Sequence, residues 1–176
     1  DAKSPQDIAA PLEEGQIVAD LLSDEAFEGY HNRPDANERS LRDGWYFTGD
    51  TGYLDAEGDL FVTGRVADMI ISGGENIYPV QIEDFLHKHE AIKDVAVIGL
   101  PDHRLGEITA AIIEIKPDYQ CTIDEIADFC TSLPRYNRPR EIIFDAVPRN
   151  PTGKIEKPRL REKYCGGSLI EAQTGN

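Results

Sequence analysis

The segment Gly64–Pro79 constrains the fold most, because it joins an apolar strand, a glycine pair and a proline within sixteen residues. Gly73 and Gly74 follow the strand directly, and glycine lets the backbone come close to a ligand because it has no Cβ. Pro79 favours the first turn of a helix. Arg65, which precedes the strand, carries a planar fork of donors that suits a hydroxyl or a phosphate. The segment therefore predicts a turn that faces a ligand.

The apolar pattern changes near residue 67, which predicts two regions. Residues 1–66 are expected to be rich in β-structure, with tight turns between the strands. Few apolar residues precede Trp45, so this region is expected to lack a core of its own and to be the end of a larger domain. Its expected strands are Gln16–Leu22, Trp45–Thr48 and Leu60–Thr63, the last two joined by a hairpin turn at residues 55–59.

Residues 67–165 are expected to form a compact α+β domain, in which helices flank a small sheet. Thr122 and Glu125 form a capping box, and the helix that it opens is expected to place Ile123, Ile126, Ala127 and Cys130 on one face. Residues 166–176 are polar and are expected to be a disordered tail. Further expected elements are the strands Val95–Ile98, Ile108–Ile115 and Glu141–Phe144, the helix that Pro79 begins and the helix Lys157–Tyr164.

The charge of the chain is unevenly distributed. The net charge is −15, which argues against general binding to nucleic acid. Nine of the 18 basic residues nevertheless lie within residues 135–163, so this part either faces a polyanion or forms a solvated helix face. No apolar run approaches the roughly 18 residues that a membrane-spanning helix needs.

The cysteines and histidines do not predict a metal site. Cys121, Cys130 and Cys165 are odd in number and lack the spacing of metal ligands. Buried or idle thiols in a reducing compartment, the cytoplasm, are the simplest interpretation. His87 and His89 lie near the end of a predicted helix without a third ligand, which favours a solvated helix end.

Two short motifs suggest chemistry, each with a simpler alternative. Asp50, in Thr48-Gly49-Asp50 at the end of an expected strand, can accept hydrogen bonds from two vicinal hydroxyls, although aspartate is common in glycine turns. Lys154 ends Pro151-Thr152-Gly153-Lys154, which is not a phosphate-binding P-loop because Pro148 and Ile155 replace the required residues. A lysine in this turn can stabilise an anionic transition state, but the motif alone favours a surface lysine.

Four motifs in order give a more specific indication. Residues 46–50, then Gly64-Arg65-x-x-Asp68, then residues 73–79 and 151–154 together resemble the C-terminal part of the acyl-adenylate-forming, or AMP-binding, superfamily. The superfamily includes acyl-CoA synthetases, peptide-synthetase adenylation domains and beetle luciferases. The resemblance covers about residues 12–164, and the form of residues 72–79 resembles bacterial acyl- and aryl-CoA synthetases more than luciferases.

The resemblance implies a fold and an activity. Residues 1–66 would be the β-rich end of a large N-terminal domain, and residues 67–165 a small C-terminal domain that rotates between two half-reactions. The first half-reaction joins a carboxylic acid and Mg²⁺-ATP into acyl-AMP, and the second transfers the acyl group to the thiol of coenzyme A. The phosphate loop and the other motifs of the N-terminal domain do not occur in this chain. We therefore expect a C-terminal fragment that is inactive alone.

The resemblance also assigns nucleotide-site roles to individual residues. Asp50 would bind the ribose hydroxyls of ATP or AMP, and Arg65 the ribose or a phosphate. Asn76 lies where some relatives contact the nucleotide. Lys154 would approach the carboxylate and the α-phosphate in the first half-reaction, where its charge offsets the charge of two meeting anions.

A second group of roles concerns coenzyme A and the hinge. Gly73 and Gly74 would border the pantetheine tunnel. Tyr136 would stack on the CoA adenine and Arg138 would pair with a phosphate, or Tyr136 would be core and Arg138 surface. Ala67 stands at the hinge, where relatives commonly carry Asp or Lys, so it offers no charged contact to steady either domain orientation.

The leading interpretation is an acid–CoA ligase that acts in fatty acid or aromatic acid metabolism. Two alternative functions remain. An adenylation domain can load a carrier protein instead of coenzyme A, although no carrier domain follows in this chain. A stand-alone, non-catalytic binding module can reuse the same fold. The sequence does not identify the carboxylic acid, because the residues of an acyl pocket would belong to the N-terminal domain.

Overall fold

The structure, a computed structural model, describes residues 4–24 and 26–166 and divides into two compact units. The boundary lies between Ala67 and Asp68, one residue beyond the change in apolar pattern. The expected tail at residues 166–176 lies outside the described residues, except for Gly166. None of the helices in the described part is both long and apolar enough to cross a membrane.

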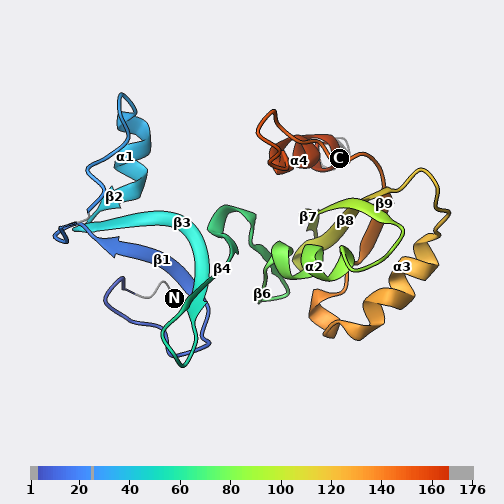
Figure 1. The fold of residues 1–176 in the computed structure, drawn as a ribbon, viewed down its shortest axis with the longest axis horizontal. Coiled ribbons are helices and arrows are strands. Elements are labelled where there is room, and N and C mark those ends of the chain that lie inside the picture. The colour runs from blue at the N-terminus through green and yellow to red at the C-terminus, as the bar shows by residue number, and fades with distance from the viewer. Residues whose placement is uncertain (1–3, 25, 167–176) are drawn as a thin grey trace, which may run out of the picture. The chain divides into compact units, whose positions relative to one another are not determined.

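The first unit is built around one long bent strand, β3, which Figure 1 shows in cyan. Strands β1, β2 and β4 all pair with β3 in antiparallel orientation. A hairpin turn joins β3 to β4, and the Asp55 side chain accepts hydrogen bonds from the amides of Glu57 and Asp59, which confirms the expected turn. The elements are β1 (Gly15–Asp20), α1 (Pro34–Ser40), β2 (Leu41–Arg42), β3 (Trp45–Leu54) and β4 (Leu60–Arg65).

The first unit has little interior. Every buried hydrophobic side chain among the described residues lies at Ile70 or beyond, which confirms that this region lacks a core of its own. Ile8 and Leu22 are 88% and 90% exposed. The buried side chains here are polar: the hydroxyls of Thr51 and Thr63 lie 3.1 Å apart across β3 and β4. Helix α1 was not expected, although Pro34 stands in its first turn.

The second unit is a small sheet with helices on both faces, as the sequence predicts. The strand order is β6-β5-β8-β7, and β9 pairs with β8 in parallel. Short 3-10 helices lie at Val66–Asp68, Cys130–Ser132 and Arg135–Asn137. The main elements are β5 (Ile70–Ser72), β6 (Glu75–Ile77), α2 (Pro79–Leu86), β7 (Ile92–Asp102), β8 (Gly106–Ile115), α3 (Ile123–Phe129), β9 (Glu141–Phe144) and α4 (Lys157–Cys165).

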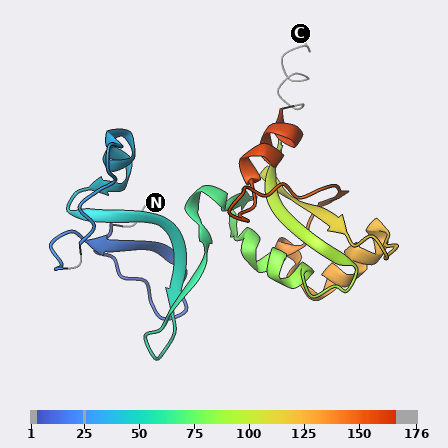
Figure 2. The ribbon, with the colours of Figure 1, turned by 45° about the horizontal axis from the view of Figure 1, so that its top comes forward.

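Alternation along β7 and β8 divides the core into two layers. Val95 and Val97 pack with residues of α2 and α3, whereas Ala96 and Ile98 pack with Leu160 of α4. Successive side chains of a strand point to opposite faces, so both faces of this hairpin are buried. Figure 2 shows α4 on one side of the sheet and α2 and α3 on the other.

The capping box of α3 forms as predicted, but the buried face of the helix differs. The Thr122 hydroxyl accepts from the Glu125 amide, and the Glu125 carboxylate accepts from the Thr122 amide. Ile126 and Cys130 are buried, whereas Ile123 is 50% exposed and Ala127 is exposed. The expectation for these two residues is wrong because the buried face is rotated around the helix, so that Ile126, Phe129 and Cys130, at i, i+3 and i+4, pack against the core.

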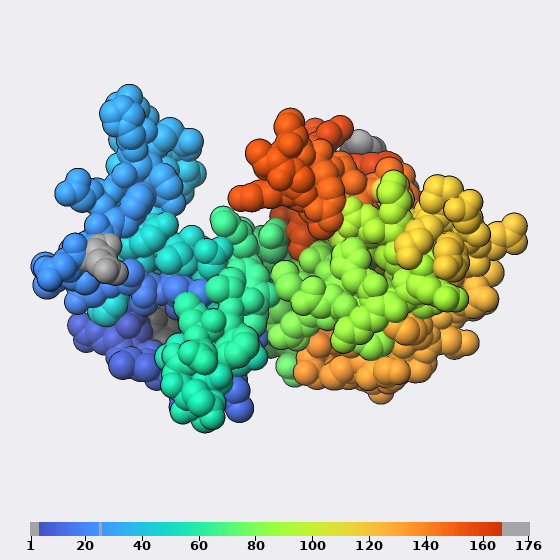
Figure 3. All heavy atoms as spheres, viewed as in Figure 1, coloured from blue at the N-terminus to red at the C-terminus, as the bar shows by residue number. Residues whose placement is uncertain are grey.

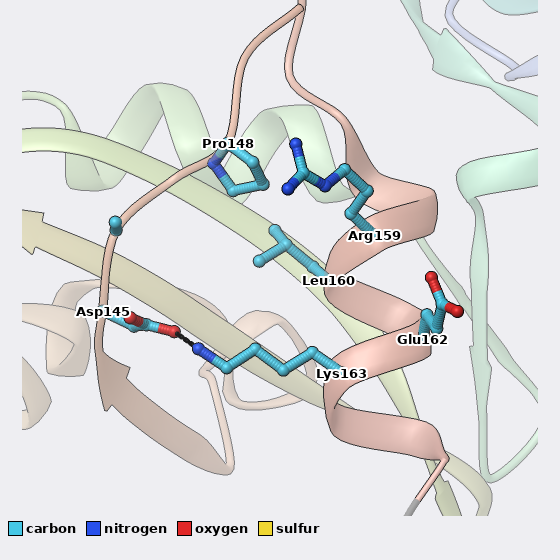
Figure 4. A pocket seen from close by; sticks show the side chains of 7 residues that line it. Asp145, Pro148, Arg159, Leu160, Glu162 and Lys163 are labelled. Atoms are coloured by element: carbon cyan, nitrogen blue, oxygen red, sulfur yellow. Dashed lines mark hydrogen bonds and ion pairs between the residues drawn. The ribbon is translucent and has the colours of Figure 1, made fainter.

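A groove of about 370 Å³ runs between α4 and the segment after β9. Figure 4 shows Leu160 at its floor and the Lys163 ammonium of α4 pointing to the Asp145 carboxylate. The Tyr164 hydroxyl also donates to Asp145. Hydrogen bonds from Lys163 and Tyr164 lower the pKa of Asp145 to about 2, so these contacts fasten α4 to the end of β9.

Asp145→Asn should weaken the second unit in a pH-dependent way. The folded-state pKa is depressed below the unfolded value of about 3.9, so the stabilisation is present above about pH 4 and is lost as pH falls towards 2. Urea unfolding at pH 6 should show a lower free energy for the variant. At pH 2 the difference from wild type should be much smaller, and a constant difference at all pH values would contradict the ion-pair explanation.

Candidate functional site

Asp50 and Arg65 form one ion pair on the first unit. The two residues are Cα partners across β3 and β4, and Arg65 Nε lies 3.0 Å from Asp50 Oδ1. Their side chains are 32% and 63% exposed, so both remain open to a ligand. Asp50 lies inside β3 and not at the end of a strand as expected, because β3 continues to Leu54 past Gly49, whose φ is +79°.

The glycine pair forms the tip of a hairpin between β5 and β6. Strand β6 was not expected, and it pairs with β5 so that Ser72 faces Glu75 and Ile71 faces Asn76. Gly73 and Gly74 have φ angles of +61° and +90°, which is what a two-residue type I′ turn requires. A Cβ on Gly74 would meet no atom within 4 Å. The backbone conformation therefore explains both glycines, and the space beside Gly74 is open.

Two contacts with β8 and its preceding turn support this hairpin. The Gly73 amide donates to the carbonyl of Leu105 over 2.8 Å, and the Ile71 amide donates to Glu107 Oε2 over 3.0 Å. Gly99 on β7 makes room for Glu107, because a Cβ there would lie 2.4 Å from Glu107 Oε1. The sequence interpretation missed Glu107, and a lone glycine inside an apolar strand is the signal that could have revealed it.

A surface cavity of about 320 Å³ lies beside the hairpin. Tyr136 lines it and is 54% exposed, which excludes the alternative that this ring belongs to the core. Arg138 instead donates to the carbonyls of Leu133 and Thr131, over 2.9 and 2.6 Å. The lining residues are Ser72, Glu75, Ile77, Leu105, Thr109, Arg135, Tyr136 and Arg140. Arg135 and Arg140 therefore supply positive charge where the sequence interpretation expected Arg138.

Lys154 ends a compact turn that Asn150 organises. Asn150 Oδ1 accepts from the Thr152 amide, the Thr152 hydroxyl and the Lys154 amide, over 3.0, 2.7 and 2.9 Å. The Asn150 amide donates to the Lys154 carbonyl, and Gly153 donates to the Asn150 carbonyl. Figure 3 shows this orange-red segment projecting from the surface. Within residues 4–24 and 26–166, the exposed Lys154 ammonium has no hydrogen-bond or ion-pair partner.

Arg149 connects this turn to the sheet. Its Nε and Nη2 lie 2.6 and 2.8 Å from the two carboxylate oxygens of Asp94 on β7, and its Nη1 donates to the carbonyl of Gly153. Burial raises the pKa of Asp94, but the hydrogen bonds from Arg149 and the Val95 amide outweigh it and hold the pKa below its ordinary value. Asp94 is therefore an anionic anchor for Arg149 at neutral pH.

Ala67 lies in the 3-10 helix Val66–Asp68, and its side chain is exposed. The residue after it, Asp68, accepts a hydrogen bond of 2.7 Å from Arg161 on α4. A charged contact is therefore present beside Ala67 and inside the second unit. It anchors the first residue of that unit to α4.

His87 and His89, which the sequence places near a helix end, contact different residues. His87 Nε2 lies 3.8 Å from Asp94, and the His89 ring packs edge-on against Phe129 at 4.9 Å. Among the described residues, no group of three or more His, Cys, Asp or Glu side chains could hold a metal ion.

The chain is similar to known proteins along most of its length. Residues 81–154 match the family described as AMP-binding enzyme C-terminal domain. The long-chain-fatty-acid–CoA ligase FadD13 of Mycobacterium tuberculosis is 46% identical over 153 residues, which are 86% of this chain and 30% of that protein. A 2-succinylbenzoate–CoA ligase of a Geobacillus strain is 40% identical over 157 residues, with coverages of 88% and 32%.

A solved structure shares the architecture. The o-succinylbenzoate CoA synthetase MenE of Bacillus subtilis, in complex with the acyl-adenylate intermediate OSB-AMP, matches with a TM-score of 0.79 and 35% identity. The match covers 90% of this chain and 32% of that chain. The chain therefore spans about a third of the length of the relatives that it matches.

Proposed function

We propose that this chain works as the C-terminal part of an acid–CoA ligase of the AMP-binding enzyme family, whose C-terminal domain matches residues 81–154. The enzyme would activate a carboxylic acid with ATP to acyl-AMP and pyrophosphate, and would then transfer the acyl group to coenzyme A. An N-terminal domain would supply the acyl pocket and the rest of the nucleotide site.

The observation that carries this proposal is the Lys154 turn. Lys154 presents an ammonium without a partner among residues 4–24 and 26–166, at the end of a turn that Asn150 and Arg149 hold in shape. Two anions, the carboxylate and the α-phosphate, must meet in the adenylation step. A preorganised positive charge is the group that stabilises such a transition state most effectively.

Asp50 and Arg65 would bind the nucleotide as one unit. Arg65 Nε lies 3.0 Å from Asp50 Oδ1, and a carboxylate accepts through both oxygens. The ribose hydroxyls would bond to Asp50, while the guanidinium of Arg65 would reach the ribose or a phosphate. Asn76 is exposed on β6, in the same hairpin as the glycine pair, and we assign it a contact to the nucleotide.

The cavity beside the hairpin would receive coenzyme A. Tyr136 would stack on the adenine, and positive side chains would hold the phosphates. Arg135 and Arg140, which line the cavity, are better placed for this than Arg138, although Arg138 keeps the turn between them in shape. The open space beside Gly74 would leave room for the pantetheine arm.

Magnesium and location complete the proposal. Mg²⁺ would enter with ATP, held mainly by the phosphates, since the described residues offer no metal cluster.

We propose a cytoplasmic enzyme, because Cys121, Cys130 and Cys165 are free thiols. Burial raises the pKa of Cys130 to about 11, so this thiol is a poor nucleophile at neutral pH.

Two assays on the full-length enzyme test the proposal. Acid-dependent ATP–pyrophosphate exchange reports the first half-reaction, and thioester formation from supplied acyl-AMP reports the second. Absence of both would overturn the proposal. Transfer to a phosphopantetheinylated carrier but not to free coenzyme A would favour the carrier-loading alternative. The 176-residue chain alone should show no exchange, and exchange by it would contradict our view that the nucleotide site is shared with the N-terminal domain.

Tyr136→Ala should raise the KM for coenzyme A about tenfold in the full-length enzyme. Loss of a base-stacking ring commonly costs about 1–3 kcal/mol, and this ring is exposed, so its removal leaves no hole in the core. The KM for ATP should not change. Tyr119→Ala is the matched control, because Tyr119 is also exposed, at 41%, but does not line the cavity. An equal effect of both variants would contradict the stacking role.

A further inference from the structure

An ion pair holds the segment that carries Lys154 at each of its ends, one to the sheet and one to a helix. Arg149 pairs with Asp94 on β7 before the turn, and Lys157 pairs with Glu83 on α2 after it. Between these two ion pairs lie the residues of the turn itself. We propose that Asp94, acting through Arg149, is a positioning residue for Lys154 in the adenylation step. The proposal rests on the function proposed above.

The contacts form a continuous path from the sheet to the lysine. The Val95 amide donates to Asp94 Oδ1 over 3.0 Å, and Asp94 is 9% exposed, so its carboxylate is fixed in the sheet. Arg149 bonds to both Asp94 oxygens and to the carbonyl of Gly153. Gly153 directly precedes Lys154. The position of the lysine backbone is therefore set by a side chain on another element.

Only an arginine can make all three of these bonds at once. Its planar guanidinium presents five donors in a fixed fork, whereas the ammonium of a lysine is a point charge on a flexible stem. A lysine at position 149 would keep the charge beside Asp94 but could not also hold the Gly153 carbonyl in the same geometry. Arg149→Lys therefore tests the geometry of the guanidinium while it keeps the positive charge.

Stability alone is a poor explanation for this pair. An ion pair that is taken out of water gains little over a well-packed apolar pair, because desolvation offsets the attraction. A bidentate pair also fixes the orientation of the guanidinium relative to the carboxylate. A displacement of about 1 Å at a catalytic group can lower the rate about 100-fold. Accurate placement of the Lys154 ammonium therefore explains the bidentate pair better than stability does.

The expected effect is specific to one half-reaction. In the full-length enzyme, Asp94→Asn and Arg149→Lys should each lower kcat for ATP–pyrophosphate exchange at least 30-fold. Thioester formation from supplied acyl-AMP should stay within twofold, because Lys154 has no part in that step. A merely structural role of Asp94, which lies in the hairpin of β7 and β8, would lower both rates together.

Lys93→Gln is the matched control. Lys93 neighbours Asp94 on β7 and pairs with Glu114 over 2.5 Å, so the variant removes an ion pair from the same strand without a contact to the turn. Both half-reactions should keep their rates in this variant. A loss of exchange equal to that of Asp94→Asn would overturn the proposal.

Amide hydrogen exchange on the 176-residue chain gives a readout that needs no activity. The amides of Gly153 and Lys154 both donate to Asn150, and they should exchange at least tenfold faster in Asp94→Asn, with β7 and β8 unchanged. Unchanged exchange at these two amides would overturn the positioning role. If the wild-type enzyme made no acyl-AMP, the proposed function would fail, while this measurement would still decide whether Asp94 holds the turn.

Discussion

Lys154→Ala in the full-length enzyme is expected to reduce acid-dependent ATP–pyrophosphate exchange by at least 10²- to 10³-fold, the usual cost of removing one preorganised electrostatic contact. The ammonium is exposed and, among the described residues, unpaired, so it is available to a ligand. Thioester formation from supplied acyl-AMP should largely survive, because the carboxylate and the α-phosphate are then already joined as a mixed anhydride.

The structure also predicts what this substitution will not do. The turn is held by Asn150 and Arg149 and not by the Lys154 side chain. Urea unfolding and the hydrogen exchange of Gly153 should therefore be the same in Lys154→Ala and in wild type. Equal loss of both half-reactions would assign the lysine a structural role and would contradict the mechanism.

Lys157→Ala, unlike Lys154→Ala, should lower the stability of the fold. It should destabilise the second unit by about 3–5 kcal/mol, the typical cost of removing one partner from a buried ion pair. Lys157 Nζ lies 2.8 Å from Glu83 Oε1, and both side chains are 10% exposed. Glu83 also accepts from the Val97 amide over 2.7 Å. Without Lys157, a buried carboxylate would lose the charge that compensates it.

Arg159→Ala provides the comparison for this stability effect. Arg159 pairs with Glu156 over 2.9 Å on the same helix, but its side chain is 68% exposed, and pairs of this kind contribute about 0–1 kcal/mol. Urea unfolding followed by circular dichroism measures both variants. Similar small losses in the two would show that Lys157 is not held in the buried pair.

Much of the second unit followed from the sequence, because its elements carry local signals. The capping box of Thr122 and Glu125, the proline at the start of α2 and the apolar runs of β7 and β8 each depend on residues close together in the chain. The face of α3 was predicted less well. Exposure of Ile123 depends on which face of the helix packs against the core, which no local pattern contains.

The site divides in the same way. The sequence alone indicated the family, the exposed Lys154 turn and the glycine pair. Turns depend on residues that are close together in the chain, and the order of motifs can be read directly from the sequence. Only the tertiary structure brought Arg149 to Asp94, paired Asp50 with Arg65 and moved Arg138 from the cavity to the carbonyls of its own turn. These contacts join residues on different strands and loops, and their choice of partner depends on burial and on competition between nearby donors and acceptors. Local residue patterns determine which elements form, whereas the partners of long polar side chains are decided when the elements pack.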